Sequence, residues 1–153
     1  MQPAVMMSAN MTRRFRLAIA ALAFAGAVVS SVSLYHHYGT SATSYCDIGE
    51  NFNCDIVNRS TYSTIAGVPV ALVGITGYLT VLTIATLYRD HPATPAMLAI
   101  GSLAGLGFAT YLTYIEGFVL AAWCILCLSS LALIFSIALL SSVLWAHDAR
   151  RAG

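Results

Sequence analysis

The residues best suited to chemistry are four cysteines arranged as two pairs. Seven residues separate Cys46 from Cys54, and Cys124 and Cys127 form the motif Cys-Ile-Leu-Cys. A Cys-x-x-Cys motif near a helix start is reactive, because the helix dipole stabilises the thiolate that attacks a disulfide. A dithiol that becomes a disulfide releases two electrons, the number that a lipid-soluble quinone accepts. The two pairs together favour a thiol–disulfide relay.

Other readings of the same residues stay open. Cys46 and Cys54 could form a static disulfide that only closes a loop on a structural scaffold. The Cys-x-x-Cys motif could also be half of a thiolate metal site. His36 and His37 could then serve as further ligands, although they equally suit the polar end of a membrane helix. We favour redox chemistry without a metal, because both pairs occur in one small chain.

The composition places the chain in a membrane. Hydrophobic residues make up 59% of it and charged residues only 8%, whereas about a quarter of the residues of a soluble domain are charged. The net charge of +1 gives no basic patch for nucleic acid. We therefore expect a lipid-bilayer partner, no nucleic-acid partner and a single domain, residues 1–153.

Four apolar stretches are long enough to cross a bilayer, which takes about 20 residues. Each should be a helix, since backbone polar groups must pair internally in hydrocarbon. The arginine-rich start of the first stretch also fits a cleaved signal peptide, but its apolar run exceeds the usual length of about 7–15 residues. The predicted fold is an all-α four-helix membrane bundle with spans at about 15–35, 67–88, 95–115 and 118–145.

The arginines set the predicted orientation, because cytoplasmic loops carry an excess of basic residues. With four spans, six of the seven fall on one side and only Arg59 falls on the other. This arrangement predicts a multi-pass protein of the inner (plasma) membrane with both termini in the cytoplasm and all four cysteines toward the extracytoplasmic side. The six are Arg13, Arg14, Arg16, Arg89, Arg150 and Arg151.

The segments that connect the predicted spans also show recognisable patterns. Residues 36–66 form a long outer loop, in which 52–60 reads as a short amphipathic helix with Phe52, Ile56 and Val57 toward the bundle. Glu116-Gly117 reads as a minimal outer turn, which would put Cys124 and Cys127 roughly 9 and 14 Å down the fourth span at 1.5 Å per residue.

Small residues in the third span predict close helix packing. Gly101 and Gly105 have GxxxG spacing, which lets helices approach closely in lipid.

The order of these motifs resembles one known family. Cys46 and Cys54 are followed by Ser60, by Gly67-Val68-Pro69-Val70-Ala71-Leu72-Val73-Gly74 at the start of the second span, and by Cys124-Ile125-Leu126-Cys127. Over about residues 15–145 the chain resembles the vitamin K epoxide reductase family, in particular its bacterial members.

The resemblance implies a four-helix bundle around a quinone, menaquinone or ubiquinone. Cys46 would exchange electrons with a periplasmic or lumenal thioredoxin-fold (DsbA-like) partner. Cys54 would pair alternately with Cys46 and Cys124, Cys127 would reduce the quinone, and Ser60 would help to orient the site. Bacterial members often carry a fused thioredoxin-like domain, so a chain ending at Gly153 is expected to use a separate partner.

Two positions depart from the animal members. Those members hold the vitamin K oxygens with an asparagine at the start of span two and a tyrosine four residues after the last cysteine. The matching cofactor-binding positions here are Val70 and Leu131, which have no hydrogen-bonding side chain. The departure favours plain quinone reduction, and a vitamin K epoxide or quinone reductase driven by lumenal thiols is the alternative.

Overall fold

The computed structural model describes residues 3–39, 46 and 48–153. Nearly all of its regular structure is helical, as predicted. The elements in chain order are α1 (Pro3–Tyr38), α2 (Cys54–Asn58), the 3₁₀ turn η1 (Thr61–Ser63), β1 (Thr64–Ile65), β2 (Val68–Pro69), α3 (Val70–Thr86), α4 (Thr94–Ile115), the π-helical turn η2 (Glu116–Leu120) and α5 (Ile125–Ala152).

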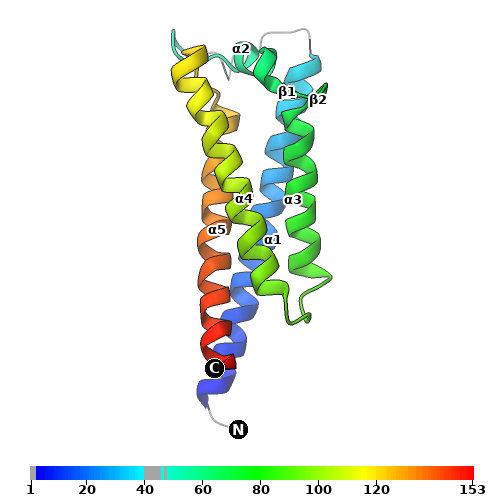
Figure 1. Cartoon of the computed structure of the whole chain (residues 1–153), viewed down its shortest axis with the longest axis vertical. Helices are drawn as coiled ribbons and strands as arrows, with labels where there is room; N and C mark the ends of the chain where they lie inside the picture. The colour runs from blue at the N-terminus through cyan, green and yellow to red at the C-terminus, as the bar shows by residue number, and fades with distance from the viewer. Residues whose placement is uncertain (1–2, 40–45, 47) are drawn as a thin grey trace.

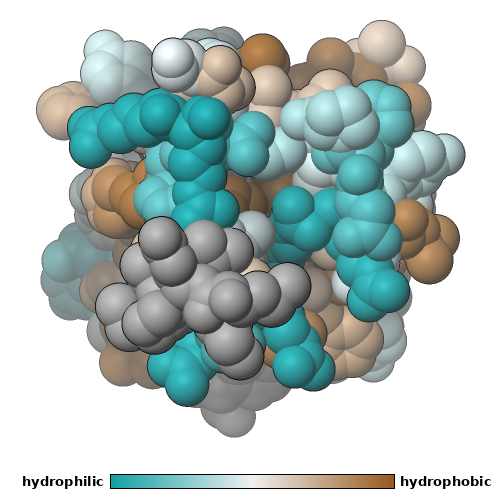
Figure 2. Space-filling view, turned by 90° about the horizontal axis from the view of Figure 1, so that it is seen from below, coloured by the Kyte–Doolittle hydropathy of each residue, from teal (hydrophilic) through white to brown (hydrophobic). Residues whose placement is uncertain are grey.

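The four long helices run side by side, and the short elements cover one end of the bundle (Figure 1). Helix α1 packs against α3 and α5, and α4 packs mainly against α5. Both termini lie at the other end, opposite α2 and the β1–β2 hairpin (Figure 1). Seen from that end, the surface carries many hydrophilic side chains (Figure 2). The last turn of α5, which lies at this end, carries Arg150 and Arg151.

Three helical stretches of the described chain are long and apolar enough to cross a membrane, namely Ala9–Tyr38, Thr94–Leu120 and Ile125–Ala152. The fourth helix, α3, is apolar but has only 17 residues. The structure therefore agrees with a helical membrane protein. The predicted second span, 67–88, is shortened because residues 64–69 form a hairpin.

The hairpin is a feature that the sequence analysis missed. Thr64 pairs with Pro69 and Ile65 with Val68. Between them Ala66 and Gly67 both have positive φ, 53° and 81°, as a two-residue hairpin turn requires. The hairpin brings the chain from α2 back to the start of α3.

The main core fills the centre of the bundle with side chains from all four long helices. Tyr78 of α3 packs there against Gly26 of α1, whose missing side chain leaves room for the ring. The most deeply buried members are Ile19, Ala23, Leu98 and Ile137.

The predicted outer turn at Glu116-Gly117 is wrong. The chain continues as a π-helical turn to Leu120, and Ala121 then takes a left-handed conformation with φ of 49°. The backbone oxygen of Glu116 accepts a hydrogen bond from Ala122, which stabilises this reversal. Helix α5 therefore begins at Ile125 instead of residue 118, and Cys124 precedes the helix as its N-cap residue.

The predicted amphipathic helix is also shorter and turned differently. Helix α2 covers only Cys54–Asn58, and Asn53 caps it by accepting a hydrogen bond from the Ile56 backbone. Val57 is buried as expected, but Ile56 is 51% exposed. Cys54 and Asn58 face inward instead, because their side chains make the contacts that hold this segment to the bundle.

Candidate thiol–disulfide site

Three of the four cysteine sulfurs meet under α2. Cys46 and Cys54 form a disulfide, with Cα atoms 5.7 Å apart. The Sγ atom of Cys124 lies 3.2 Å from the Sγ atom of Cys54. All three side chains are buried, with at most 1% of their surface exposed. A free thiol therefore lies in contact with a disulfide, which is the geometry that thiol–disulfide exchange requires.

A short backbone pairing joins the two chain segments that carry these sulfurs. Phe52 and Trp123 form an isolated parallel bridge. Asn53 donates its N–H to the oxygen of Trp123 at 3.1 Å, and Trp123 donates to the oxygen of Asn51 at 2.8 Å. Because Cys54 and Cys124 each lie one or two residues beyond the pairing, it sets their sulfurs side by side.

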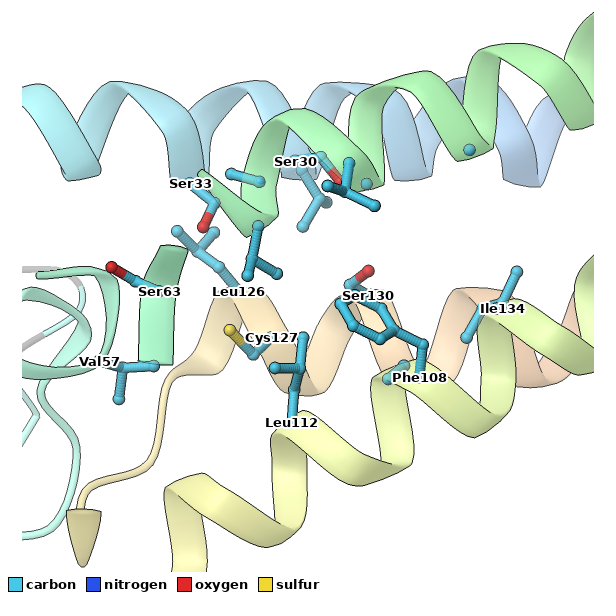
Figure 3. Close-up of a pocket in the computed structure, with 18 of the residues that line it drawn as sticks. Ser30, Ser33, Val57, Ser63, Phe108, Leu112, Leu126, Cys127, Ser130 and Ile134 are labelled. Atoms are coloured by element: carbon cyan, nitrogen blue, oxygen red, sulfur yellow. The ribbon is translucent and has the colours of Figure 1, made fainter. Parts of the chain in front are cut away.

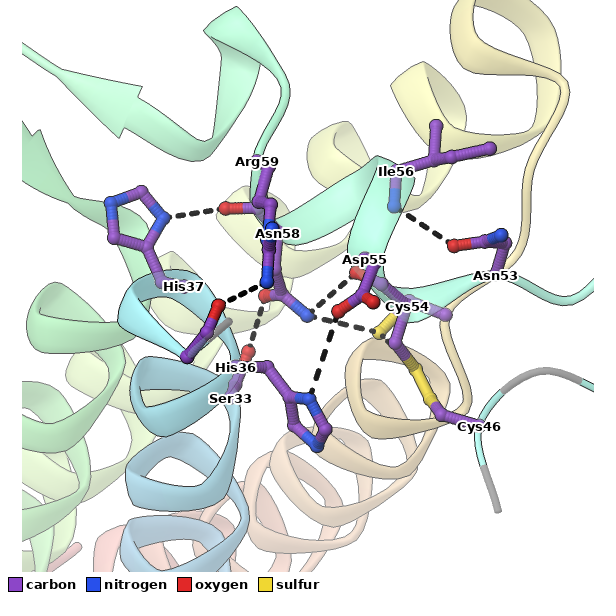
Figure 4. Close-up of polar contacts among 12 residues, drawn as sticks. Ser33, His36, His37, Cys46, Asn53, Cys54, Asp55, Ile56, Asn58 and Arg59 are labelled. Atoms are coloured by element: carbon purple, nitrogen blue, oxygen red, sulfur yellow. Dashed lines mark hydrogen bonds and ion pairs between the residues drawn. A yellow bond between two sulfur atoms is a disulfide. The ribbon is translucent and has the colours of Figure 1, made fainter. Parts of the chain in front are cut away.

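The buried amide of Asn58 ties α2 to its surroundings (Figure 4). Its Oδ1 atom accepts a hydrogen bond from the Ser33 hydroxyl of α1 at 2.6 Å. Its Nδ2 atom donates to the oxygen of Cys54 at 3.0 Å and lies 3.8 Å from Cys124 Sγ. One side chain thus contacts helix α1 and both halves of the sulfur cluster.

The two histidines belong to the same outer network. His36 is 2% exposed, and its Nδ1 atom lies 3.9 Å from Asp55 of α2. His37 Nδ1 contacts the backbone oxygen of Asn58 (Figure 4). In the described chain, the group of ligand atoms compact enough for a metal consists of three cysteines, with Sγ atoms within 4.8 Å of one another. The histidines therefore act as helix-to-loop contacts here.

The thiol of Cys124 lies just before the apolar helix α5. Its side-chain hydrogen bond with Cys127 lowers its pKa, and this effect outweighs burial and the Glu116 carboxylate, which both raise it. A lower pKa increases the fraction of thiolate, the nucleophilic form. The sulfur that faces the disulfide is thus poised to act as the nucleophile of the motif.

Glu116 is a site residue that the sequence analysis missed. Its side chain is 2% exposed, and it lies at the end of α4 instead of in the expected minimal outer turn. Its Oε2 atom accepts the backbone N–H of Cys124 at 3.2 Å, and the residue lines the same cavity as Cys127. A signal was present in the sequence, since Glu116 is the one charged residue between Asp90 and Asp148.

A cavity of about 420 Å³ lies between α1, α3, α4 and α5, directly below the sulfur cluster. Figure 3 shows the Cys127 side chain at its wall, on the side toward Val57. Most lining side chains are apolar. Polar groups line the α2 end and include Ser33, His37, Asn58, Ser60, Tyr62 and Ser63.

Small residues open this cavity. Gly74, Gly77, Gly101 and Gly105 all line it. A Cβ atom at Gly101 would meet nothing within 4 Å, whereas one at Gly105 would lie 3.3 Å from Ile134. The GxxxG motif therefore gives close packing only at Gly105, and at Gly101 it leaves space.

The predicted quinone-contacting residues have different positions. Ser60 and Val70 line the cavity with Cys127. Leu131 does not line it, and the neighbouring residue Ser130 of α5 does. The Ser60 hydroxyl donates to the oxygen of Val57 at 2.9 Å, so it also closes the end of α2.

A bundle of apolar helices that holds a disulfide against a free Cys-x-x-Cys pair, above an apolar cavity, defines a membrane redox protein of the thiol–disulfide class. The chain belongs to the vitamin K epoxide reductase family, whose sequence model matches residues 17–142. The resemblance read from the sequence is thereby confirmed. Members of this family are oxidoreductases that generally couple thiol–disulfide chemistry, with thioredoxin-like partners, to quinones. No curated protein matches the chain.

Proposed function

We propose that this protein oxidises a dithiol of a thioredoxin-fold partner and passes the two electrons to a membrane quinone, which supports disulfide bond formation. The observation that carries the proposal is the 3.2 Å contact between the Sγ atoms of Cys54 and Cys124, with Cys127 next in line at the cavity wall. This contact joins the outer cysteine pair to the membrane pair.

In the first step, a partner thiolate attacks Cys46 and breaks the Cys46–Cys54 bond. Cys46 is 1% exposed, so docking must first uncover its sulfur. Resolution by the second partner thiol leaves Cys46 and Cys54 reduced and the partner oxidised. Two electrons have then entered the chain.

In the second step, the Cys54 thiolate attacks Cys124 of an oxidised Cys124–Cys127 pair. The Cys54–Cys124 bond forms, and Cys127 leaves as a thiolate. Attack of Cys46 on Cys54 restores the outer disulfide and releases Cys124. The end of this step has the arrangement seen here, a Cys46–Cys54 disulfide with free Cys124 and Cys127.

The residues around the cavity fit a quinone. Its volume of about 420 Å³ falls in the range of roughly 300–1,000 Å³ that is usual for small-molecule sites. Its apolar walls suit an isoprenoid tail, and the hydroxyls at the α2 end suit the ring oxygens. A bound quinone supplies the acceptor for two electrons and two protons as Cys124 and Cys127 return to a disulfide. Menaquinone and ubiquinone both suit these walls.

The proposed topology has four spans and both termini in the cytoplasm of the inner membrane. The 17 residues of α3 extend about 26 Å at 1.5 Å per residue, close to the hydrocarbon thickness of about 30 Å. The first turns of α1 and the last turns of α5 lie at the end of the bundle opposite α2 (Figure 1). These ends carry arginines, whereas α2 carries Cys54. This separation supports an extracytoplasmic site under the positive-inside rule.

The test is quinone reduction by the purified full chain in detergent, with a dithiol reductant and a short-tailed ubiquinone analogue. Cys127→Ala should abolish it while Cys46 still forms a mixed disulfide with a thioredoxin-fold protein. Ser129→Ala is the matched control, since Ser129 lies on the same helix, donates to the backbone oxygen of Ile125 and does not line the cavity. Quinone reduction that survives in Cys127→Ala would refute the relay. The wild-type chain should also rescue a host that lacks its own disulfide-generating enzyme.

Epoxide reduction and metal binding are the two alternative functions. Epoxide reduction driven by lumenal thiols is less supported, because Val70 and Leu131 offer no hydrogen bond to a substrate oxygen. A metal would be bound by the three Sγ atoms that lie within 4.8 Å of one another. Two of these atoms are joined in a disulfide, however, and are therefore not thiolate ligands. Zinc retained stoichiometrically by the chain, with its cysteines protected from alkylation, would favour the metal function instead.

A further inference from the structure

The feature that the relay leaves unused is the buried carboxylate of Glu116. We propose that Glu116 carries the proton of the Cys127 thiol to the quinone when the Cys124–Cys127 pair is oxidised. The inference rests on the proposed quinone reduction and assigns a proton path to it.

The position of Glu116 gives it access to both ends of this path. Glu116 and Cys127 line the same cavity, the one in which the quinone is proposed to bind. The backbone N–H of Cys124 donates to Oε2 at 3.2 Å and fixes the orientation of the group. An ionisable group inside a membrane helix is costly and usually functional.

The surroundings leave Glu116 free to gain and lose a proton. In the described part of the chain it forms no ion pair, since the salt bridges there join His36 to Asp55 and Arg89 to Asp90. No fixed cation therefore holds it in the ionised form. The titratable groups that line the cavity with it are Cys127, His37, Tyr62 and Tyr78. Cys124 donates its backbone N–H to Glu116, and Asp55 lies on α2, which packs against η2.

Oxidation of the Cys124–Cys127 pair releases two electrons and two protons. The S–H bonds of Cys124 and Cys127 break, and an S–S bond forms between the two sulfurs. Two electrons pass to the quinone. The Cys127 proton reaches it through Glu116, while the Cys124 proton leaves to the outer solvent and an equivalent one is taken up from there.

Replacing Glu116 with glutamine tests this role, because the amide oxygen still accepts the Cys124 N–H but cannot carry a proton. The rate constant kcat for reduction of the ubiquinone analogue should fall by about 10²–10⁴, the usual contribution of general acid–base catalysis. The KM for the quinone should stay nearly constant, and the pH–rate profile should lose the limb that reports the carboxylate. Glu50→Gln is the control, since Glu50 is exposed in the outer loop and should leave all three unchanged.

A second measurement needs no quinone. The infrared difference spectrum between dithiothreitol-reduced and diamide-oxidised protein should contain a carboxyl band that is absent in Glu116→Gln and retained in Glu50→Gln. Glu116→Asp, which keeps a carboxylate, should retain both this band and the pH limb even if the glutamine variant does not fold.

The outcomes separate the two proposals. A wild-type chain that reduces no quinone would overturn the proposed function, and the infrared band would still test Glu116. A full rate and unchanged pH profile in Glu116→Gln would overturn the proton role. So would a wild-type infrared spectrum without a carboxyl change.

Discussion

Gly117 is the position where one added methyl group should disturb the sulfur cluster. A Cβ atom there would lie 2.7 Å from Cη2 and 2.9 Å from Cζ2 of the Trp123 ring, whereas ordinary contact begins at 3.4 Å. In Gly117→Ala the ring must therefore move by about 0.7 Å. Overpacking of this kind costs about 1–3 kcal/mol.

The displacement matters because Trp123 carries the backbone pairing that sets Cys54 beside Cys124. The two sulfurs are 3.2 Å apart, so a shift of this size that passes from the ring to the Trp123 backbone would widen their separation to about 3.9 Å. A misplacement of about 1 Å can slow a reaction by roughly 10²-fold. We expect exchange between Cys54 and Cys124 to slow by about tenfold to a hundredfold.

The assay uses a Cys46→Ser background, in which Cys54 is free to pair with Cys124. Air oxidation, alkylation and mass spectrometry then give the fraction of chains with a Cys54–Cys124 disulfide over time. Gly107→Ala is the matched control, because a Cβ atom at Gly107 would meet nothing within 4 Å and Gly107 does not line the cavity. Equal rates in the Gly117→Ala and Gly107→Ala proteins would refute the reasoning.

Two further predictions concern the same cluster. Asn58→Leu should lower the free energy of unfolding by about 1–3 kcal/mol, because it leaves the buried hydroxyl of Ser33 without its partner. Denaturation of the protein in detergent measures this change. A free energy of unfolding equal to that of the wild type would contradict the prediction. Cys127→Ala should move the alkylation of Cys124 to higher pH, since the hydrogen bond with Cys127 is the largest factor that lowers its pKa. Site-resolved alkylation with a small reagent across neutral pH checks the shift, and an unmoved profile would count against the assigned cause.

The sequence predicted features that depend on composition and order along the chain. The long apolar stretches required helices, because hydrocarbon leaves backbone groups no other partner. The spacing of Cys46, Cys54, Ser60 and the Cys-Ile-Leu-Cys motif was enough to indicate the family. Helix ends were predicted less well, since apolar residues continue through Glu116–Cys124 and do not mark where α4 stops and α5 starts.

The orientation of α2 illustrates a second limit. Its pattern suggested that Ile56 faces the bundle, but only five residues are helical, too few for an apolar face to fix the rotation. The hydrogen bonds of Asn58 to α1 and to Cys54 decide it instead. The bond to Ser33 of α1 crosses 25 residues of sequence, and no local pattern reports it.

The sequence by itself determined that this is a helical membrane protein with two cysteine pairs. Only the tertiary structure decided which sulfurs touch, how Trp123 brings the outer loop to α5, and that Glu116 lies buried beside Cys127. The physical reason is that helices and redox chemistry follow from local residue types and spacing. Contacts between segments about 70 residues apart, such as Cys54 with Cys124, depend on how the whole bundle packs.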